Sequence, residues 1–420
     1  MEDPQIGVAY FRESSSASHV EVEASIASLR SSLSVARSIV SQICMTICRS
    51  GESPRNALLA WFASVLNLNK KRTAMQVDYT DVSGDGFMMN ILHVLLHLAE
   101  PILQGGWKLL EKVDPTYPQS NHRLQYDDET RLAADSDMLK RWWVDQRNKN
   151  AQESLVRSLQ SAAHEAAESA MGSAASSSSS AVRSSADEEM TDASISSRTV
   201  SNDVDSRTDS AVVSLEFKFV TEIFFMTLRS IQLGFLPMTT TYSETLLRSL
   251  NRLRDIVQDL ENTSPRTPTQ EVELMTFKTR FENLLRTKFC YDVYMRDDEL
   301  LSALVRFASG NAEWLVKKLL SQPPRDNLLP LPLPPSAVFA SLPEHAVETM
   351  ATVLITTIHH VPEVIDRNSA VLDDILTVAI AAAASPLHVK NPYLRAKLME
   401  FVSMIFPQAA RSSSADLEED

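Results

Sequence analysis

This chain of 420 residues contains two histidines one helical turn apart, His93 and His97. Their spacing would allow both side chains to bind one metal ion. Imidazoles at positions i and i+4 of a helix can share one ion. The zinc hydrolases with this spacing carry glutamate directly after the first histidine, however, and Val94 stands at that position. We therefore predict that both histidines are core or boundary residues of a helix and bind no metal.

The three cysteines, Cys44, Cys48 and Cys290, carry the thiols that could act as nucleophiles or metal ligands. Cys44 and Cys48 are one turn apart on an apolar helix that we expect to begin near Ala24. No second pair of Cys or His residues follows at zinc-finger spacing, and Cys290 stands between two aromatic residues. Because cysteine is commonly a small core residue, all three are predicted to be buried.

The segment Gly84-Asp85-Gly86 could be mistaken for a glycine-rich phosphate-binding loop. It lacks the Lys-Ser/Thr pair that would reach phosphate and magnesium, and no strand is expected before it. The prediction is instead that Asp85 caps a helix starting at Phe87, with the two glycines supplying the turn.

A short basic cluster, Lys70-Lys71-Arg72, is predicted to be solvated surface, because it is too brief to indicate nucleic-acid binding or nuclear targeting. The adjacent rings of Trp142 and Trp143 are predicted to be packing anchors, with one ring free to stay at the surface. No catalytic, cofactor-binding or metal-binding residue is predicted, and no cofactor is expected.

Glycine is scarce in the chain, and this scarcity indicates the elements that surround these residues. Average usage of about 7% would give roughly 29 glycines, and the sequence has 9. Tight hairpins need glycine where φ is positive, whereas helices are weakened by it. The sequence therefore predicts an all-α fold, and 420 residues exceed the length of a single hydrophobic core.

The net charge of −14 argues against nucleic acid as a partner, since phosphate binding needs a basic face. Three cysteines cannot form a disulfide framework, and the N-terminus lacks the basic and apolar regions of a signal peptide. The longest apolar run, from Ile375 to Ala384, falls short of the roughly 20 residues that a membrane span needs. We expect a cytoplasmic and nuclear protein without membrane insertion.

Composition divides the chain into six segments. They are an N-terminal part of a helical core at 1–150, a disordered Ser/Ala-rich insert at 151–211, central core helices at 212–320, a Pro-rich connection at 321–335, a C-terminal helical stack at 336–407, and an acidic tail at 408–420. The insert is predicted to be disordered because it lacks the large apolar side chains that offset chain ordering.

Helical periodicity is clear in the central and C-terminal segments. One amphipathic helix is indicated by the stripe Leu246, Leu247, Leu250, Leu253, Ile256, Val257 and Leu260, with Thr241 and Glu244 as its capping box. Three more helices are predicted over 344–361 (with Ser341 and Glu344 at its start), 371–384 and 393–406 (opened by Asn391-Pro392). Successive helices joined by short turns favour a stacked, armadillo-like solenoid, although the sequence shows no clean repeat period.

An ordered set of local motifs resembles the core of the ubiquitin conjugation factor E4 family. The N-terminal motifs are Leu66-Asn67-Leu68-Asn69-Lys70-Lys71-Arg72, Met75-Gln76-Val77-Asp78 and Asp85-Gly86-Phe87-Met88-Met89-Asn90-Ile91-Leu92. The later ones are Phe224 to Gly234, Cys290-Tyr291-Asp292, Asp297 to Leu301, Ala312-Glu313-Trp314-Leu315, Leu342-Pro343-Glu344, Pro362-Glu363-Val364, Leu372 to Leu376 and Asn391 to Leu398. Together they cover roughly residues 57–145 and 213–407.

The resemblance implies an armadillo-like rod that holds substrates and partners, and a C-terminal U-box that recruits a ubiquitin-loaded conjugating enzyme. It implies elongation of ubiquitin chains on already ubiquitinated substrates for proteasomal degradation, in quality control and in degradation of endoplasmic-reticulum clients. The implied partners are the conjugating enzyme, ubiquitinated substrates, a AAA-type segregase ATPase and proteasome shuttle factors.

Two departures from the family pattern bear on activity: no U-box follows Phe406, and the insert at 151–211 is long for its position. The chain is either a truncated product or a paralogue that has lost ligase function, and we favour truncation. By itself it is expected to be inactive. The alternative reading from the residues alone is a non-enzymatic helical-repeat adaptor or transport scaffold.

Deleting residues 155–210 is predicted to leave folding intact, because their Ser/Ala/Asp composition offers no core. The midpoint of thermal unfolding, followed by circular dichroism, should stay within a few degrees of that of the full chain. A large loss of cooperativity in the deletion variant would show that the segment packs.

Overall fold

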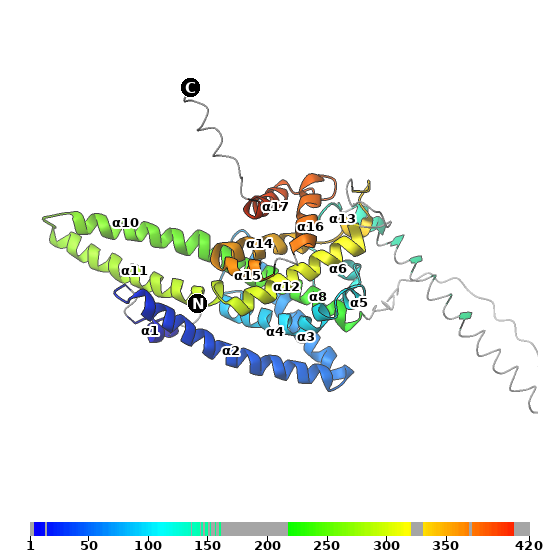
Figure 1. Ribbon diagram of the computed structural model, residues 1–420, viewed down its shortest axis with the longest axis horizontal. Helices are drawn as coiled ribbons and strands as arrows, with labels where there is room; N and C mark the ends of the chain where they lie inside the picture. The colour runs from blue at the N-terminus through cyan, green and yellow to red at the C-terminus, as the bar shows by residue number, and fades with distance from the viewer. Residues whose placement is uncertain are drawn as a thin grey trace, which may run out of the picture. The chain divides into compact units, whose positions relative to one another are not determined.

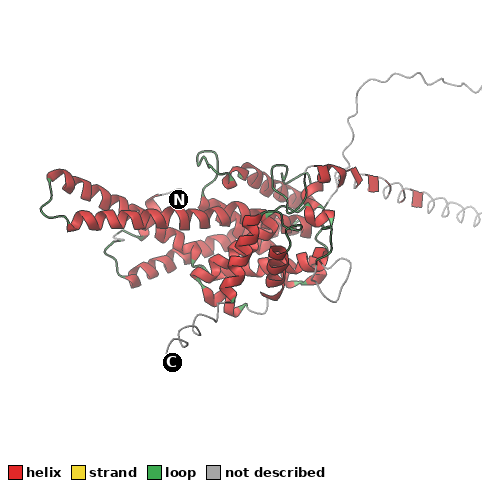
Figure 2. Cartoon of the chain, turned by 90° about the horizontal axis from the view of Figure 1, so that it is seen from above, coloured by secondary structure: helices red, strands yellow, loops and turns green. Residues whose placement is uncertain are grey.

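The computed structural model describes residues 4–12, 15–135, 217–320, 331–368 and 372–406, together with isolated residues between 137 and 160. Throughout these residues the regular elements are helices, and the single extended contact is an isolated bridge between Arg131 and Pro343. The all-α prediction is therefore confirmed (Figures 1 and 2). One compact unit combines residues 1–135 with 215–420, and residues 136–214 form a second.

The helices of the first unit form an N-terminal group and a later group in the chain. Its N-terminal part contains α1 (Pro4–Tyr10), α2 (His19–Arg49), α3 (Glu52–Leu68), η1 (Lys70–Thr73), α4 (Asp85–Gln104), α5 (Trp107–Leu110) and α6 (Tyr117–Ser120). Its later part contains α8 (Phe219–Ser230), η2 (Ile231–Phe235), α9 (Leu236–Thr240), η3 (Thr241–Leu247), α10 (Arg248–Asn262), α11 (Pro268–Met295), α12 (Asp298–Trp314), η4 (Leu315–Leu320), α13 (Ala337–Ala340), α14 (His345–His360), α15 (Pro362–Arg367), α16 (Leu372–Ala384) and α17 (Pro392–Ile405).

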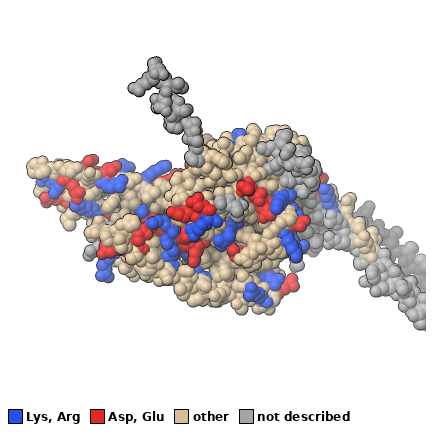
Figure 3. Space-filling view, in the orientation of Figure 1, with Lys and Arg blue, Asp and Glu red and all other residues tan. Residues whose placement is uncertain are grey.

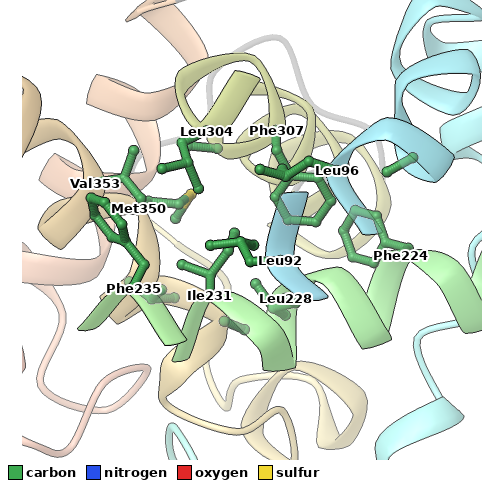
Figure 4. Close-up of a cluster of buried hydrophobic side chains, with 14 of the residues drawn as sticks. Leu92, Leu96, Phe224, Leu228, Ile231, Phe235, Leu304, Phe307, Met350 and Val353 are labelled. Atoms are coloured by element: carbon green, nitrogen blue, oxygen red, sulfur yellow. The ribbon is translucent and has the colours of Figure 1, made fainter. Parts of the chain in front are cut away.

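The core lies where α4, α8, α12 and α14 meet (Figure 4). Ten fully or almost fully buried side chains from these helices and η2 point toward one another there: Leu92, Leu96, Phe224, Leu228, Ile231, Phe235, Leu304, Phe307, Met350 and Val353. α4 and α8 are apolar around much of their circumference, as expected for helices enclosed by others. Burying such side chains contributes about 1.5–3 kcal/mol each, so this contact dominates the stability of the unit.

The chain remains helical from Phe219 to Asn262, because α8, η2, α9, η3 and α10 run on without a break. η2 and η3 are π-helical turns inside this run. The prediction that Thr241 starts a new helix is therefore wrong: the Thr241 side chain caps nothing, and helical backbone precedes it. The buried residues of α8 and η2 hold the chain helical before Thr241, which overrides the local capping pattern.

The C-terminal helices lie close to their predicted ranges, and one predicted cap is confirmed. The Asn391 side chain accepts hydrogen bonds from the backbone N–H groups of Tyr393 at 3.0 Å and Leu394 at 3.4 Å, at the start of α17. The predicted cap at the start of α14 is wrong. Ser341 instead ends α13, where its hydroxyl donates to the Val338 carbonyl at 2.9 Å, and the Glu344 carboxylate accepts from Asn391 at 2.9 Å.

α10 and α11 form an antiparallel helical hairpin that projects from the rest of the unit (Figure 1). We call residues 248–283 of this hairpin the arm. The predicted stripe of α10 is confirmed as the face that contacts α11: Leu250 and Leu253 are buried, and Ile256, Val257 and Leu260 are half-buried. On α11, Val272 and Met275 are exposed. The arm thus has an apolar seam between its two helices and side chains in solvent on its other faces.

Within the part of the chain that the structure describes, three helical stretches are long and apolar enough to cross a membrane by length and composition alone: α2, α4 and the run Phe219–Asn262. The expectation that no segment qualifies is wrong by this criterion, since it considered uninterrupted apolar runs alone. Of the qualifying windows, 22% of residues are buried in α2, 56% in α4 and 83% in the long run. Packing inside the unit therefore explains the apolar composition of the last two.

Several sequence predictions fall outside the described residues. These are most of the insert at 151–211, residues 321–330 of the Pro-rich connection, and the acidic tail at 408–420.

The apolar helical pattern of 371–384 and 393–406 predicts that Leu376 and Leu398 are core residues of the C-terminal stack. Leu398 is 1% exposed, which confirms its assignment, whereas Leu376 is half-buried at the edge of the core. Leu398→Ala should lower the free energy of unfolding by about 2–5 kcal/mol, the range for a buried leucine. Leu376→Ala, as the matched comparison, should cost less, and chemical denaturation measures both. Equal losses for the two variants would contradict the difference in burial.

Candidate functional site

The two histidines with metal-ligand spacing lie at the edge of α4. His93 is partly buried and His97 is exposed. Burial lowers the pKa of His93 to about 4, and the nearby Arg37 charge acts in the same direction. Among the described residues, no group of three His, Cys, Asp or Glu side chains is placed to hold a metal ion. The pair therefore has the boundary position that the sequence predicted.

All three cysteines are buried, as predicted. Cys44 and Cys48 lie on the inner face of α2, a helix that begins at His19 rather than near Ala24 because Ser18 and Glu21 form a capping box there. Burial raises the pKa of both thiols, and it raises the pKa of Cys290 to about 11. At neutral pH these groups are protonated thiols, which are poor nucleophiles.

Asp85 does not cap the helix that follows it, contrary to the prediction. α4 begins at Asp85 itself, its N-cap is Gly84, and no side chain accepts a hydrogen bond at that cap. The carboxylate of Asp85 instead pairs with the guanidinium of Arg72 and accepts a hydrogen bond from the hydroxyl of Tyr291. Asp85 thus pairs with the charged side chain of Arg72 instead of capping backbone N–H groups of α4.

The prediction that Arg72 is solvated is also wrong, because its side chain is buried and the residue is 4% exposed. Its Nε donates to the Leu233 carbonyl at 2.7 Å, and its Nη1 donates to the Ser83 carbonyl. Lys70 and Lys71 do stay at the surface, where they pair with Asp128 and Asp81. We name Arg72, Ser83, Asp85, Leu233 and Tyr291 the Arg72 cluster. It joins η1, the start of α4, η2 and α11.

Two asparagines of the same motif hold the neighbouring loops. The Asn69 side chain accepts from the Ser83 backbone N–H at 2.7 Å and donates to its hydroxyl at 3.1 Å. The Asn67 side chain donates to the Arg123 carbonyl at 2.7 Å and accepts from the Gln125 N–H at 2.9 Å. Each amide thus satisfies backbone groups of a loop that has no regular structure of its own.

A second buried cluster contains Tyr126, Glu129, Arg229, Gln232 and His345, and we name it the Glu129 cluster. Glu129 pairs with Arg229 and accepts a hydrogen bond from the Gln232 amide at 3.0 Å. The Nδ1 of His345 lies 3.4 Å from Oε2 of Glu129, and the His345 ring stacks on Tyr126. Arg229 and His345 are 2% and 1% exposed. The cluster fastens the loop before Arg131 to α8, η2 and α14.

The pKa values of Glu129 and His345 in the Glu129 cluster are both lowered, for different reasons. Burial by itself raises the pKa of the Glu129 carboxyl, but His345 and the permanent charge of Arg229 hold that pKa well below its ordinary value. Burial lowers the pKa of His345, and this outweighs the attraction of the Glu129 carboxylate. The folded cluster therefore contains an ionised Glu129 and a neutral His345 at neutral pH.

The Arg72 and Glu129 clusters hold loops to helices, and their role is structural rather than catalytic. The charged groups of the two clusters are already paired with one another. The three cysteines of the chain are buried and are protonated thiols rather than thiolates at neutral pH. Sequence reasoning found the motif residues but not the pairing of Arg72 with Asp85 or of Arg229 with Glu129. The one available signal was charge within otherwise apolar helices, such as Arg229 between Leu228 and Ile231.

Acid is predicted to destabilise the protein through His345. The unfolded chain binds a proton on this residue near its ordinary pKa of 6.5, whereas the folded chain does not, so stability falls as the pH drops below 6.5. Between pH 7.5 and 5.5 the loss from one such histidine is about 1 kcal/mol. His345→Phe should remove this part of the pH dependence in denaturation experiments. Identical pH slopes for the wild type and His345→Phe would contradict the prediction.

Comparison with known proteins supplies the remaining evidence. The model of the family described as "Ubiquitin elongating factor core" matches residues 1–419. The "Probable ubiquitin conjugation factor E4" of Arabidopsis thaliana is 26% identical over 415 residues, which are 98% of this chain and 36% of that relative. The "Ubiquitin conjugation factor E4" of Schizosaccharomyces pombe is 24% identical over 411 residues, 94% of this chain and 33% of the relative.

A third relative, the "E4 ubiquitin-protein ligase UFD2" of Saccharomyces cerevisiae, is 32% identical over 91 residues, 21% of this chain and 9% of the relative. The chain spans roughly a third of the length of the first two relatives. The resemblance found in the motifs is confirmed, and the family model extends it across the segment between them. The chain belongs to the ubiquitin elongating factor core family.

Proposed function

We propose that this chain is the core region of an E4-type ubiquitin ligase, which elongates ubiquitin chains on already ubiquitinated substrates for proteasomal degradation. In this proposal the core is the scaffold that holds the substrate and partners, and a U-box supplies contact with the conjugating enzyme. The observation that carries the proposal is the family match over residues 1–419, together with two relatives named ubiquitin conjugation factor E4 that align with nearly the whole chain.

The state of the thiols supports a non-covalent role for the core. A covalent ligase passes ubiquitin through a cysteine thioester, and the attacking group must be a thiolate. Cys44, Cys48 and Cys290 are all buried, with pKa values raised by burial. A ligase of the U-box type needs no such residue, because it holds the loaded conjugating enzyme in a reactive pose.

The architecture supports a scaffold. Buried ion pairs at Arg72–Asp85 and Arg229–Glu129 fix loops to the central helices, so partners bound at separate places on this unit would be held at defined positions. The arm adds a projecting surface, on which Lys and Arg alternate with Asp and Glu (Figure 3). Mixed charges of this kind suit protein partners better than nucleic acid, which needs a basic face.

The proposed partners of the whole protein are a ubiquitin-conjugating enzyme, ubiquitinated substrates, a AAA-type segregase ATPase and proteasome shuttle factors. The proposed location is the cytoplasm and nucleus, with a role in the degradation of endoplasmic-reticulum clients. The rival reading, a non-enzymatic adaptor or transport scaffold, is not favoured by the names of the relatives.

The proposal is tested by single-turnover discharge of ubiquitin from a loaded conjugating enzyme to free lysine. Three proteins are compared: this chain, this chain fused to the U-box of a family member, and that U-box alone. The bare chain should not accelerate discharge, whereas both proteins with a U-box should. A bare chain that speeds discharge, with Cys290→Ser abolishing the effect, would show a covalent ligase and overturn the proposal.

A second readout separates the scaffold from the U-box. With a substrate that already carries one ubiquitin, the fusion should build longer chains at a protein concentration where the U-box alone does not. The matched control joins the same U-box to an unrelated helical protein of similar length. If that control elongates chains as well as the fusion does, the core contributes no scaffold.

A further inference from the structure

A cavity of about 320 Å³ lies between α2, the first turn of α4, α9 and the end of α11, with α1 over one side. Its walls are mostly apolar: Leu29 and Leu33 come from α2, Phe87 from α4, Met238 from α9 and Val293 from α11. It is a concave pocket rather than a sealed void, because Ile6 and Phe87 in its wall are partly exposed, and well-formed concave pockets are few in a protein. A space of this size bounded by five helices is therefore a candidate binding site.

The size of the cavity defines what it can hold. It has roughly twice the volume of the apolar cavities of about 150 Å³ that stay dry and bind benzene. It also reaches the lower end of the range of about 300–1,000 Å³ for ligand pockets. A fused two-ring molecule, or an aliphatic chain of similar volume, matches this space.

The charges of the lining decide which chemistry is accepted. The one carboxylate in the wall, Asp85, already pairs with Arg72 and accepts the hydroxyl of Tyr291. Burial raises the pKa of Cys290, so its thiol is neutral at physiological pH. An ionised ligand would lose its hydration here and find no unused counter-charge in the wall, which is costly.

The cavity meets solvent beside α1 and beside the first turn of α4, where the wall residue Phe87 is 37% exposed. Ile6 lines the cavity and is 41% exposed, whereas Phe11, just beyond α1, is 4% exposed. Phe11 lies in a small apolar cluster with Ile26, Leu29, Cys290 and Val293, and its carbonyl accepts from Nε of Arg286 at 3.0 Å. α1 is thus anchored at its C-terminal end, while Ile6 lies at the rim.

We propose that this cavity is a binding site for a small, uncharged and largely apolar molecule, entering past Ile6. The site is separate from the scaffold role proposed above and does not depend on it. Discrimination rests on the neutral lining: uncharged ring compounds are accepted, and their carboxylates are rejected.

Indole and indole-3-carboxylate test the proposal, since the second probe adds a charge to the same ring system. The full chain is labelled with ¹³C in its methionine methyl groups and titrated with each probe while the methyl resonances are followed by NMR. Indole should shift the Met238 resonance to saturation in the millimolar range or below. The resonance of Met226, which is buried in α8 and does not line the cavity, should stay in place.

Leu33→Trp fills the cavity and should weaken indole binding at least tenfold. Leu387→Trp is the matched control, because Leu387 is 56% exposed and does not line the cavity. The proposal is overturned if Met238 shows no saturable shift with indole, if the carboxylate binds as tightly, or if Leu33→Trp binds indole like the control. Since the first two measurements use the wild type, the proposal stays testable even if Leu33→Trp fails to fold.

Discussion

The ion pair between Arg72 and Asp85 is the interaction on which much of the fold depends. The guanidinium is buried, and its three donating nitrogens reach the Ser83 carbonyl just before α4, the Asp85 carboxylate at the start of α4 and the Leu233 carbonyl at the centre of η2. Asp85 in turn holds Tyr291 of α11. Removing one member of a buried pair leaves the other charge without a partner, at a cost of about 3–5 kcal/mol. Apolar contacts are non-directional, so they hold helices together without choosing their relative positions. The hydrogen bonds and the ion pair of the Arg72 cluster are directional, so they fix the relative positions of the elements that they join.

The Glu129 cluster repeats this arrangement at Arg229 and Gln232 of the long helical run Phe219–Asn262. There the loop supplies the carboxylate, and the helix supplies the guanidinium of Arg229. Backbone bonds continue the attachment: Leu132 N–H donates to the Leu342 carbonyl at 2.9 Å, and Lys390 N–H donates to the Leu132 carbonyl at 2.9 Å. Both clusters place an irregular segment between helices that are distant in sequence. A scaffold for large partners requires such fixed loops, because loops otherwise move more than the elements they connect.

Local patterns predicted what local physics controls. The seam of α10, the cap at Asn391 and the burial of Leu398 followed from helical period and capping, which involve residues within a few positions of one another. The failures at Arg72, Asp85 and Thr241 arise because tertiary packing overrides the local pattern, and for the buried polar clusters the partners are distant in the sequence. Asp85 and Tyr291 are 206 positions apart, and Glu129 and Arg229 are 100 apart, so no periodicity brings them together. The cavity was beyond sequence analysis for the same reason, since five separate helices bound it.

The arm has a consequence for the energetics of the molecule. The inner end of α11 contacts α1, α2 and Tyr242, whereas its outer half lies beside α10 in the projecting hairpin (Figure 1). Most backbone hydrogen bonds in that outer half are therefore covered by a single apolar seam, and their local opening free energy lies well below that of the core. Amide protons there would exchange with solvent through opening of the arm alone, without global unfolding. The molecule combines a cooperative centre with an extension that can open and close while the centre stays unchanged.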